Sequence, residues 1–86
     1  MTGAGKGIGR CIATALAARG AAVVVNNRAR DGNDPARSTV AEIEAAGGRA
    51  VADLHSVEAD GAAEATVASA IEHFGRLDIV VANAAI

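Results

Sequence analysis

Thr2-Gly3-Ala4-Gly5-Lys6-Gly7-Ile8-Gly9 is the stretch that decides the fold of this chain, because it places four glycines within seven residues. Glycine tolerates positive φ and lets the backbone come close to a ligand, but each glycine costs conformational entropy on folding. Such a cluster therefore indicates a turn with a specific task. If a helix begins in or just after the turn, its free N–H groups and the positive end of its dipole form an anion site. The stretch predicts a phosphate-binding loop.

The spacing of the glycines separates three kinds of phosphate loop. A P-loop requires Ser or Thr after its Gly-Lys pair, but Gly7 follows Lys6. A Gly-x-Gly-x-x-Gly fingerprint fails as well, because no start within the stretch puts glycine at the sixth position. The spacing Thr-Gly-x-x-x-Gly-x-Gly does fit, at Thr2, Gly3, Gly7 and Gly9. It resembles the cofactor loop of the short-chain dehydrogenase/reductase family; the plain alternative is a glycine-rich helix start without a ligand.

Length and composition favour one small domain with an interior of small side chains. The chain has 86 residues, of which 51% are apolar, and Phe74 is its only aromatic residue. The net charge of −2, with both signs scattered, predicts no nucleic-acid partner and no membrane-binding patch. No apolar run approaches the roughly 20 residues that span a bilayer, and no signal peptide is recognisable, so we expect a cytoplasmic protein. The single cysteine, Cys11, is expected to be a small buried residue of the first helix.

Strand and helix patterns alternate along the chain. Short apolar runs predict strands at 21–25, 50–54 and 77–81, with residues 1–2 as the end of a first strand. Helical spacing predicts helices at 8–19 and 63–74, and the Asp34-Pro35 pair predicts the start of a helix that stops at Gly47-Gly48. The apolar positions that we expect to face the interior are Ile8, Ile12, Ala15 and Leu16 in the first helix, Ala36, Val40 and Ile43 in the second, and Ala63, Val67, Ala70, Ile71 and Phe74 in the third.

This alternation predicts an α/β fold of the Rossmann type, with a doubly wound parallel sheet and helices on both faces. We expect residues 1–86 to form a partial NAD(P)-binding Rossmann domain, truncated so that the first strand is nearly missing and the C-terminal half is absent. Ligands bind such sheets beyond the carboxyl ends of the strands. The candidate cofactor-binding residues at that edge are Thr2, Gly3, Lys6, Gly7, Ile8, Gly9, Asn27, Arg28, Ser56, Val57, Asn83, Ala84 and Ala85.

The residues after the second strand bear on the choice of cofactor. A site for NAD usually has an Asp or Glu about 20 residues beyond the glycines, where it binds the adenosine ribose. This chain has the neutral pair Asn26-Asn27 there, followed by Arg28, and Lys6 stands in the glycine loop. Basic residues at these two positions look like those that the family uses for NADP(H), unless they are simply solvated surface charges. The resemblance favours NADP(H) and leaves NAD(H) possible.

Two further segments correspond to family positions with substitutions. Ser56-Val57 stand where the family has an Asp and an apolar residue that hold the adenine, with Asp53 and His55 nearby. Asn83-Ala84-Ala85 is similar to the end of the family's Asn-Asn-Ala-Gly segment, with Ala82 for its first Asn and Ala85 for its Gly. In the family, the position of Asn83 stabilises the central sheet and takes part in a catalytic relay. For Asn83 we expect the structural role, with an accessory catalytic role possible.

Catalysis in the family resembles hydride transfer at an alcohol or carbonyl, with a tyrosine as acid/base, a lysine four residues later and a serine that orients the substrate. This chain contains no tyrosine, and its only lysine is Lys6. No catalytic residue of that kind is therefore expected in it. His55 and His73 lack partners at ligand spacing, so we expect no metal site.

The sequence is therefore expected to be the N-terminal cofactor-binding part of an oxidoreductase, inactive alone, whose full-length form is a homo-oligomer with a small alcohol or carbonyl substrate. Residues 26–38 and 56–58 look closest to the (3R)-hydroxyacyl-CoA dehydrogenase type within the family. The pocket for the substrate and the usual subunit interface would follow Ile86. Two other hypotheses stay open: a non-catalytic nucleotide-binding or interaction module, and a truncated product without function.

Overall fold

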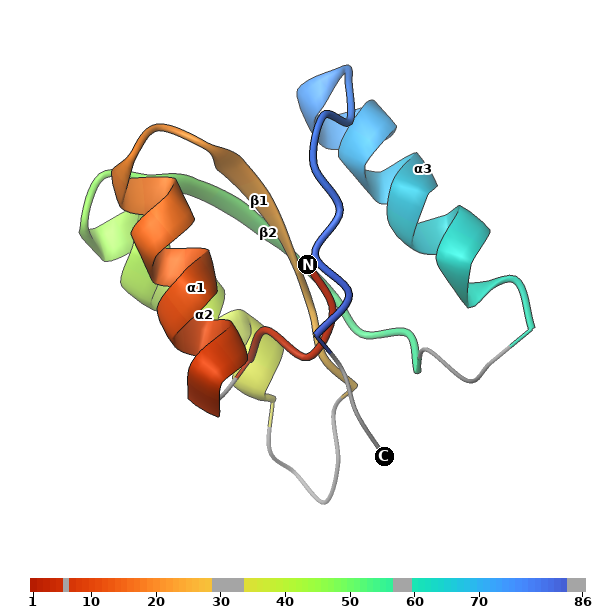
Figure 1. Ribbon diagram of the computed structural model, residues 1–86, viewed down its shortest axis with the longest axis horizontal. Coiled ribbons are helices and arrows are strands. Elements are labelled where there is room, and N and C mark those ends of the chain that lie inside the picture. Colours follow the sequence, from red (N-terminus) through yellow and green to blue (C-terminus); the bar gives the residue numbers. More distant parts are fainter. Residues whose placement is uncertain (6, 29–33, 57–59, 84–86) are drawn as a thin grey trace.

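Two parallel strands and three helices follow one another in the computed structural model, which describes residues 1–5, 7–28, 34–56 and 60–83 (Figure 1). Each predicted helix is present, as are the strands predicted at 21–25 and 50–54, with ends that differ by one or two residues. The elements are α1 (Gly7–Ala18), β1 (Ala22–Asn26), α2 (Pro35–Ala45), β2 (Arg49–Asp53) and α3 (Ala62–Phe74).

β1, α2 and β2 form a parallel βαβ unit. The register runs from Ala22 opposite Arg49 to Asn26 opposite Asp53, so the two strands end side by side. α1 and α2 lie on one face of the strands and α3 lies on the other (Figure 1). The central valines of β1 are buried because both faces are covered, as expected of a parallel strand. The α/β prediction with helices on both faces is confirmed.

Residues 1–4 lie between β1 and the extended segment 77–83. Thr2 forms a parallel bridge with Asn26, whose backbone N–H donates to Met1 O at 3.0 Å. On the other side, the Thr2 N–H donates to Val81 O at 3.1 Å. Residues 1–4 thus take the place of a strand between two neighbours, although only Thr2 has strand pairing.

The strand predicted at 77–81 is wrong, because the structure describes this segment without assigning it as a strand. Its neighbour is the short N-terminal stretch, which is too brief to supply a continuous ladder of backbone hydrogen bonds. The segment nevertheless runs beside the N-terminus in an extended path (Figure 1).

Local signals set the helix ends as predicted. The Asp34 carboxylate caps α2 by accepting from the Arg37 N–H at 3.1 Å, and Pro35 occupies the first turn. α3 ends at Gly75, which has a φ of +79° and whose N–H donates to Ile71 O.

The core is built from alanine, valine and one large aliphatic side chain. Ile43 of α2 is 2% exposed and is the largest side chain that is fully buried. Around it pack Ala13 and Ala17 of α1 and Val23 and Val25 of β1. The low aromatic content is therefore matched by closely spaced helices and strands.

The face of α1 that we predicted to be buried is correct only in part, since Ile12 is half-buried and Leu16 is half-buried against the core. Gly9, Ala13 and Ala17 face the interior, whereas Ile8 is 75% exposed and Ala15 is also exposed. Small residues allow α1 to approach its neighbours closely. The helix therefore turns its small residues inward, although some of its larger apolar side chains are then exposed. Cys11 lies on the outward side, so its expected burial is also wrong.

α3 packs through small residues and leaves larger ones uncovered. Ala62 and Ala70 are buried, but Ala63, Val67 and Ile71, which we expected in the interior, are exposed. Together with the extended segment they form what we call the exposed apolar face: Val67, Ile71, Leu77, Ile79 and Val80.

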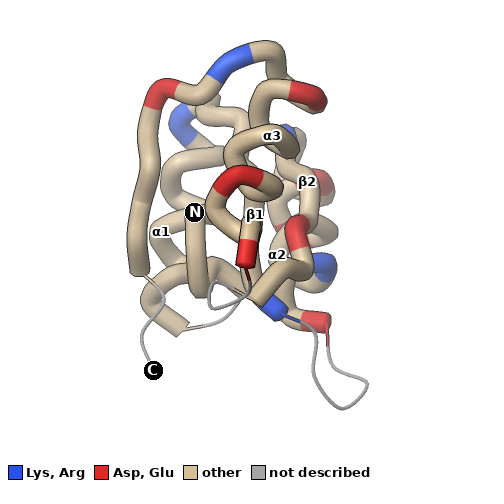
Figure 2. The backbone as a smooth tube through the Cα atoms, turned by 90° about the vertical axis from the view of Figure 1, so that its right-hand side faces the viewer, with Lys and Arg blue, Asp and Glu red and all other residues tan. Residues whose placement is uncertain are grey.

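Along the described backbone, positions of Lys or Arg alternate in space with positions of Asp or Glu, and neither sign is confined to one end (Figure 2). In the part of the chain that the structure describes, every helix is too short or too polar to cross a bilayer.

Candidate functional site

The glycine loop leads from the first strand position into α1. Gly3 and Gly7 both have a φ of +61°, in the left-handed region that L-residues with side chains rarely adopt. The Ala4 N–H donates to Asn26 O at 3.0 Å, which fixes the loop beside the end of β1. The loop thus lies at the carboxyl edge of the sheet, as the sequence predicted.

Close backbone contacts explain the glycines at positions 5 and 9. A Cβ atom on Gly9 would clash with the carbonyl oxygen of Gly3 and lie 2.6 Å from Asn83 Nδ2. A Cβ atom on Gly5 would lie 2.6 Å from Cβ of Pro35, at the start of α2. These two glycines permit tight packing around the loop and do not by themselves indicate a ligand.

α2 is joined to the loop through a buried hydroxyl group. Thr39 is fully buried, and its Oγ1 donates to Gly5 O at 3.0 Å. This hydrogen bond satisfies the buried hydroxyl group and ties the loop to α2. The sequence analysis did not predict that Thr39 faces the interior, because the sequence pattern of α2 does not distinguish a buried threonine from a solvent-facing one.

The N-terminus of α1 has the properties of an anion site. The first N–H groups of a helix lack partners within the helix and carry its positive dipole end. No acidic residue lies in the first turn of α1. A Cβ atom placed on Gly7 would meet no atom of the described residues within 4 Å beyond its own turn. Ile8 follows Gly7 and projects outward, whereas Lys6 lies outside the described residues.

Asn83 connects the extended segment to the loop. Its backbone N–H donates to Thr2 Oγ1 at 3.0 Å, and its side-chain Nδ2 donates to Gly3 O at 3.3 Å. Asn83 therefore holds the loop in place, which agrees with the structural role that we expected. Ala84 and Ala85 lie outside the described residues.

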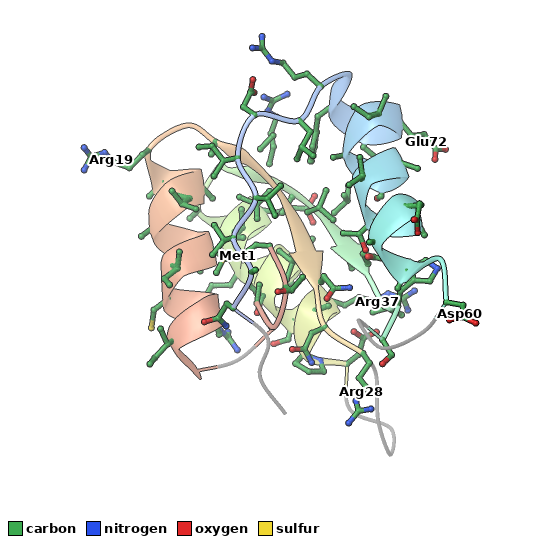
Figure 3. The ribbon with its side chains drawn as sticks, turned by 45° about the vertical axis from the view of Figure 1, so that its right-hand side comes forward. Met1, Arg19, Arg28, Arg37, Asp60 and Glu72 are labelled. Atoms are coloured by element: carbon green, nitrogen blue, oxygen red, sulfur yellow. The ribbon has the colours of Figure 1, made fainter. Side chains whose placement is uncertain are left out.

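The two neighbouring asparagines at the end of β1 differ in their burial. Asn26 is buried, whereas Asn27 is half-buried and donates its backbone N–H to Asp53 O at 3.0 Å. The exposed Arg28 extends beyond the carboxyl end of β1, on the side opposite Arg19 (Figure 3). Arg28 is thus positioned at the same edge as the glycine loop.

A polar cluster at the end of β2 was missed by the sequence reasoning. The side chain of Asp53 is buried, and its Oδ2 accepts from Asn26 Nδ2 at 3.0 Å and from the Thr66 hydroxyl. Its Oδ1 contacts Nδ1 of His55. Burial alone disfavours the carboxylate, but the hydrogen bonds from Thr66, His55 and Asn26 outweigh it and lower the pKa of Asp53. The sequence does show a polar residue at the end of each strand, Asn26 and Asp53. Only the register of the two strands shows that these residues lie side by side.

The remaining predicted adenine residues are only partly placed. Ser56 is half-buried just beyond β2, and Val57 lies outside the described residues. The structure thus brings Thr2, Gly3, Gly7 and Gly9 to one edge with Asn83. Asn27 and Arg28 follow β1 and Ser56 follows β2 at this same edge.

Comparisons with known proteins match this arrangement. The family profile described as short chain dehydrogenase matches residues 1–86. The chain belongs to the short chain dehydrogenase family.

A solved structure supports the fold of this short chain dehydrogenase chain. A short chain dehydrogenase from Mycobacterium avium superposes with a TM-score of 0.92 and 48% identity, over 99% of this chain and 33% of that one. This likeness confirms the Rossmann-type fold that the sequence predicted.

Two curated relatives have equal identity with this chain. The mouse peroxisomal multifunctional enzyme type 2 is 48% identical and covers the whole chain, which spans 12% of it. The L-rhamnose 1-dehydrogenase (NAD(P)(+)) of a Sphingomonas strain is also 48% identical, and the chain spans 33% of it. The chain therefore spans about a third or less of the curated relatives that it matches.

Two cavities of this short chain dehydrogenase chain lie beside α3 and the extended segment, and Thr2 is the one described glycine-loop residue that lines either of them. One, of about 270 Å³, is lined by Leu16, Phe74 and Asp78 among others, and the second, of about 230 Å³, lies between α3 and the extended segment. The second is lined mostly by apolar residues, among them Val67, Ile79 and Val80 of the exposed apolar face. Neither cavity is lined by Asn27, Arg28 or Ser56, which directly follow the two strands.

Within the described ranges, no three His, Cys, Asp or Glu side chains are grouped as metal ligands would be. The polar cluster around Asp53 is instead satisfied by hydrogen bonds among protein groups.

Proposed function

We propose that this chain is the cofactor-binding part of a short-chain oxidoreductase that uses NADP(H) or NAD(H) and acts on an alcohol or carbonyl substrate. The observation that carries the proposal is the glycine loop, whose two left-handed glycines lead into a helix at the carboxyl edge of a parallel sheet. The family match over residues 1–86 supports it, and we propose that these residues form a partial NAD(P)-binding Rossmann domain.

The described residues fit a dinucleotide at this edge. The first turn of α1 has backbone N–H groups without partners inside the helix and no acidic residue of its own, and a Cβ atom on Gly7 would meet no described atom within 4 Å beyond its own turn. Thr2, Gly3 and Gly9 shape the loop, and Asn83 holds it through Gly3 O. In this proposal the loop binds the pyrophosphate, with Ile8 and Lys6 beside it. The nicotinamide group, when bound, supplies hydride transfer to or from a substrate carbon.

Within this proposal NADP(H) is favoured over NAD(H). Asn26 and Asn27 are uncharged, so neither side chain repels a 2′-phosphate at the end of β1. Arg28 is exposed beyond the same strand and is a suitable donor to a phosphate dianion. Ser56, Val57, Ala84 and Ala85 complete the proposed contacts by family resemblance.

This chain is proposed to bind without catalysing. It contains no tyrosine and has no lysine besides Lys6, so the family's acid/base pair is absent from its sequence. The exposed apolar face supports the same conclusion, since Ile79 and Val80 are 65% and 71% exposed on a segment beside the sheet. Contiguous apolar surface of this kind is usually covered by further protein. The (3R)-hydroxyacyl-CoA dehydrogenase type and a homo-oligomeric full-length form are narrower proposals from the resemblance.

Titration of the chain with NADPH and NADH tests this function, with isothermal calorimetry and thermal unfolding as readouts. Both ligands should bind and raise the unfolding temperature, and at equal concentration the more tightly bound ligand should raise it further. Arg28→Ala should weaken NADPH by roughly three- to tenfold and leave NADH unchanged, because it removes an exposed charge-assisted hydrogen bond to the 2′-phosphate. Arg19→Ala, at the opposite end of the molecule, is the matched control (Figure 3). Absence of binding by both dinucleotides would overturn the proposal.

A further inference from the structure

The cavity of about 270 Å³ lies at the amino edge of the sheet, opposite the glycine loop. Ala22 and Arg49, which begin β1 and β2, line this cavity together with the last turns of α1 and α3. None of the described residues that we propose for the dinucleotide lines it. We call it the amino-edge cavity, and it is separate from the proposed cofactor site.

The interior of the amino-edge cavity is apolar. Its walls include Val23 of β1 and Ala70 of α3, which are 6% and 4% exposed. Leu16 of α1 and the ring of Phe74 are half-buried and line it from the two faces of the sheet. Sites for small molecules usually have volumes from about 300 Å³ upward. A cavity of about 270 Å³ therefore suits a short aliphatic group.

The charged side chains of the amino-edge cavity leave one guanidinium group for a ligand. Among the described residues that line it, Arg49, Arg76 and Asp78 are charged. Arg76 is already paired, since its Nε and Nη2 donate to Asp78 Oδ1 at 3.0 and 2.8 Å. In the part of the chain that the structure describes, Arg49 has no ion-pair partner. Two guanidinium groups and one carboxylate leave one positive charge, which favours an anion.

Phe74 holds the guanidinium group of Arg49 beside the apolar wall. The Cζ atom of Arg49 lies 5.9 Å from the centroid of the Phe74 ring. This distance is within the range of about 6 Å for a cation–π contact. A guanidinium group presents its N–H donors in a planar fork that matches the two oxygens of a carboxylate. The structure thus combines a carboxylate-binding group with an apolar cavity.

We propose that the amino-edge cavity binds a small aliphatic carboxylate, with the alkyl chain inside the cavity and the carboxylate on the guanidinium group of Arg49. A cationic ligand is disfavoured by the positive charge of the lining. α1 and α3 both end here, and the partial negative charge of their last carbonyl groups opposes an anion. Arg49 is therefore the residue that determines the charge of the ligand.

Titration of the full chain with straight-chain carboxylates, followed by calorimetry, tests the proposal. Hexanoate is the probe and hexan-1-ol is its uncharged analogue. Hexanoate should bind roughly three- to tenfold more tightly than hexan-1-ol, because only the carboxylate pairs with Arg49. Affinity should rise from propanoate to hexanoate by up to about fourfold per methylene group. It should stop rising before decanoate, because the cavity is then full.

Arg49→Met removes the charge but keeps a side chain of similar length. This variant should lose the preference for hexanoate over hexan-1-ol and still bind the alcohol. Arg19→Met is the matched control, because Arg19 directly follows α1, projects outward and does not line the cavity (Figure 3). The control should keep the preference of the unaltered chain. Equal losses in the two variants would overturn the role of Arg49.

Backbone amide NMR shifts locate the ligand. Of the two cavities, Ala22 and Phe74 line only the amino-edge cavity, whereas Ala63 and Val67 line only the other. Hexanoate should shift the signals of Ala22 and Phe74. Shifts confined to Ala63 and Val67, equal affinity for hexanoate and hexan-1-ol, or no saturable binding of hexanoate would overturn the proposal.

Competition separates this site from the proposed function. NADPH should leave the affinity for hexanoate unchanged, because the glycine loop lies at the other edge of the sheet. Displacement of hexanoate by NADPH would indicate that the carboxylate binds at the N-terminus of α1 and would overturn the amino-edge site. Absence of dinucleotide binding would overturn the proposed function and leave the amino-edge site standing.

Discussion

The side-chain amide of Asn83 donates a hydrogen bond to the carbonyl oxygen of Gly3 at 3.3 Å, across 80 positions of the chain. The backbone N–H of Asn83 donates to Thr2 Oγ1 close by. The glycine loop is therefore fixed by a segment at the other end of the chain and by Thr39 of α2, and does not depend on α1 alone. These hydrogen bonds hold the N-terminus of α1 in position without a bound ligand.

Asn83→Ala should lower the free energy of unfolding by about 1 kcal/mol, because it removes one partly buried hydrogen bond and frees Gly3 O. Urea denaturation followed by circular dichroism measures this change. Asn27→Ala is the matched control, since the Asn27 side chain donates only to the adjacent Arg28 carbonyl in the contacts described, and we expect a smaller loss. Equal losses in the two variants would argue against a specific role of Asn83.

Gly9→Ala should destabilise the chain by about 1–3 kcal/mol, because its Cβ would meet Gly3 O and Asn83 Nδ2 in a packed region. Gly7→Ala separates this clash from backbone strain, since its Cβ would meet no described atom within 4 Å beyond its own turn, whereas its φ of +61° opposes the substitution. The Gly9 variant should also lose the contact that fixes the loop. A normal Asn83 side-chain NMR signal in Gly9→Ala would contradict this account.

The helices and the two strands could be predicted from sequence because their signals are local. The Asp34-Pro35 start of α2 and the Gly75 stop of α3 each depend on adjacent residues, and the valine run of β1 indicates burial on both faces. The position of the glycine loop followed from its spacing and from the rule that ligands bind at the carboxyl ends of parallel strands.

Features that depend on tertiary packing could not be predicted. The inner face of α1 was misassigned because apolarity ranks Ile8 above Gly9, whereas close approach to Gly3 requires the glycine. The segment at 77–81 has the composition of a strand, but strand formation depends on a long enough neighbour. The Asp53 cluster requires the register of β1 and β2, which composition does not contain.

Ile43→Ala should cost about 2–5 kcal/mol in the free energy of unfolding, since Ile43 is the largest fully buried side chain and a cavity would remain. Ile8→Ala is the matched control, because the same atoms are removed from a side chain that is 75% exposed. Thermal and urea unfolding of both variants measure the difference. A comparable loss in Ile8→Ala would indicate that Ile8 is buried, as the sequence pattern predicted.

Acid should weaken the fold through Asp53. Its pKa is lowered in the folded chain by the hydrogen bonds from Thr66, His55 and Asn26, which outweigh the opposing effect of burial. The stability that this shift contributes is present above the unfolded pKa of about 3.9 and is lost as the pH falls through the lower folded value. Asp53→Asn should therefore be less stable at neutral pH but show a flatter decline between about pH 5 and pH 2, measured by urea denaturation at each pH. Asp78→Asn, which alters an exposed ion pair with Arg76, should keep the pH dependence of the unaltered chain. An unchanged acid slope in Asp53→Asn would show that the cluster does not stabilise the ionised form.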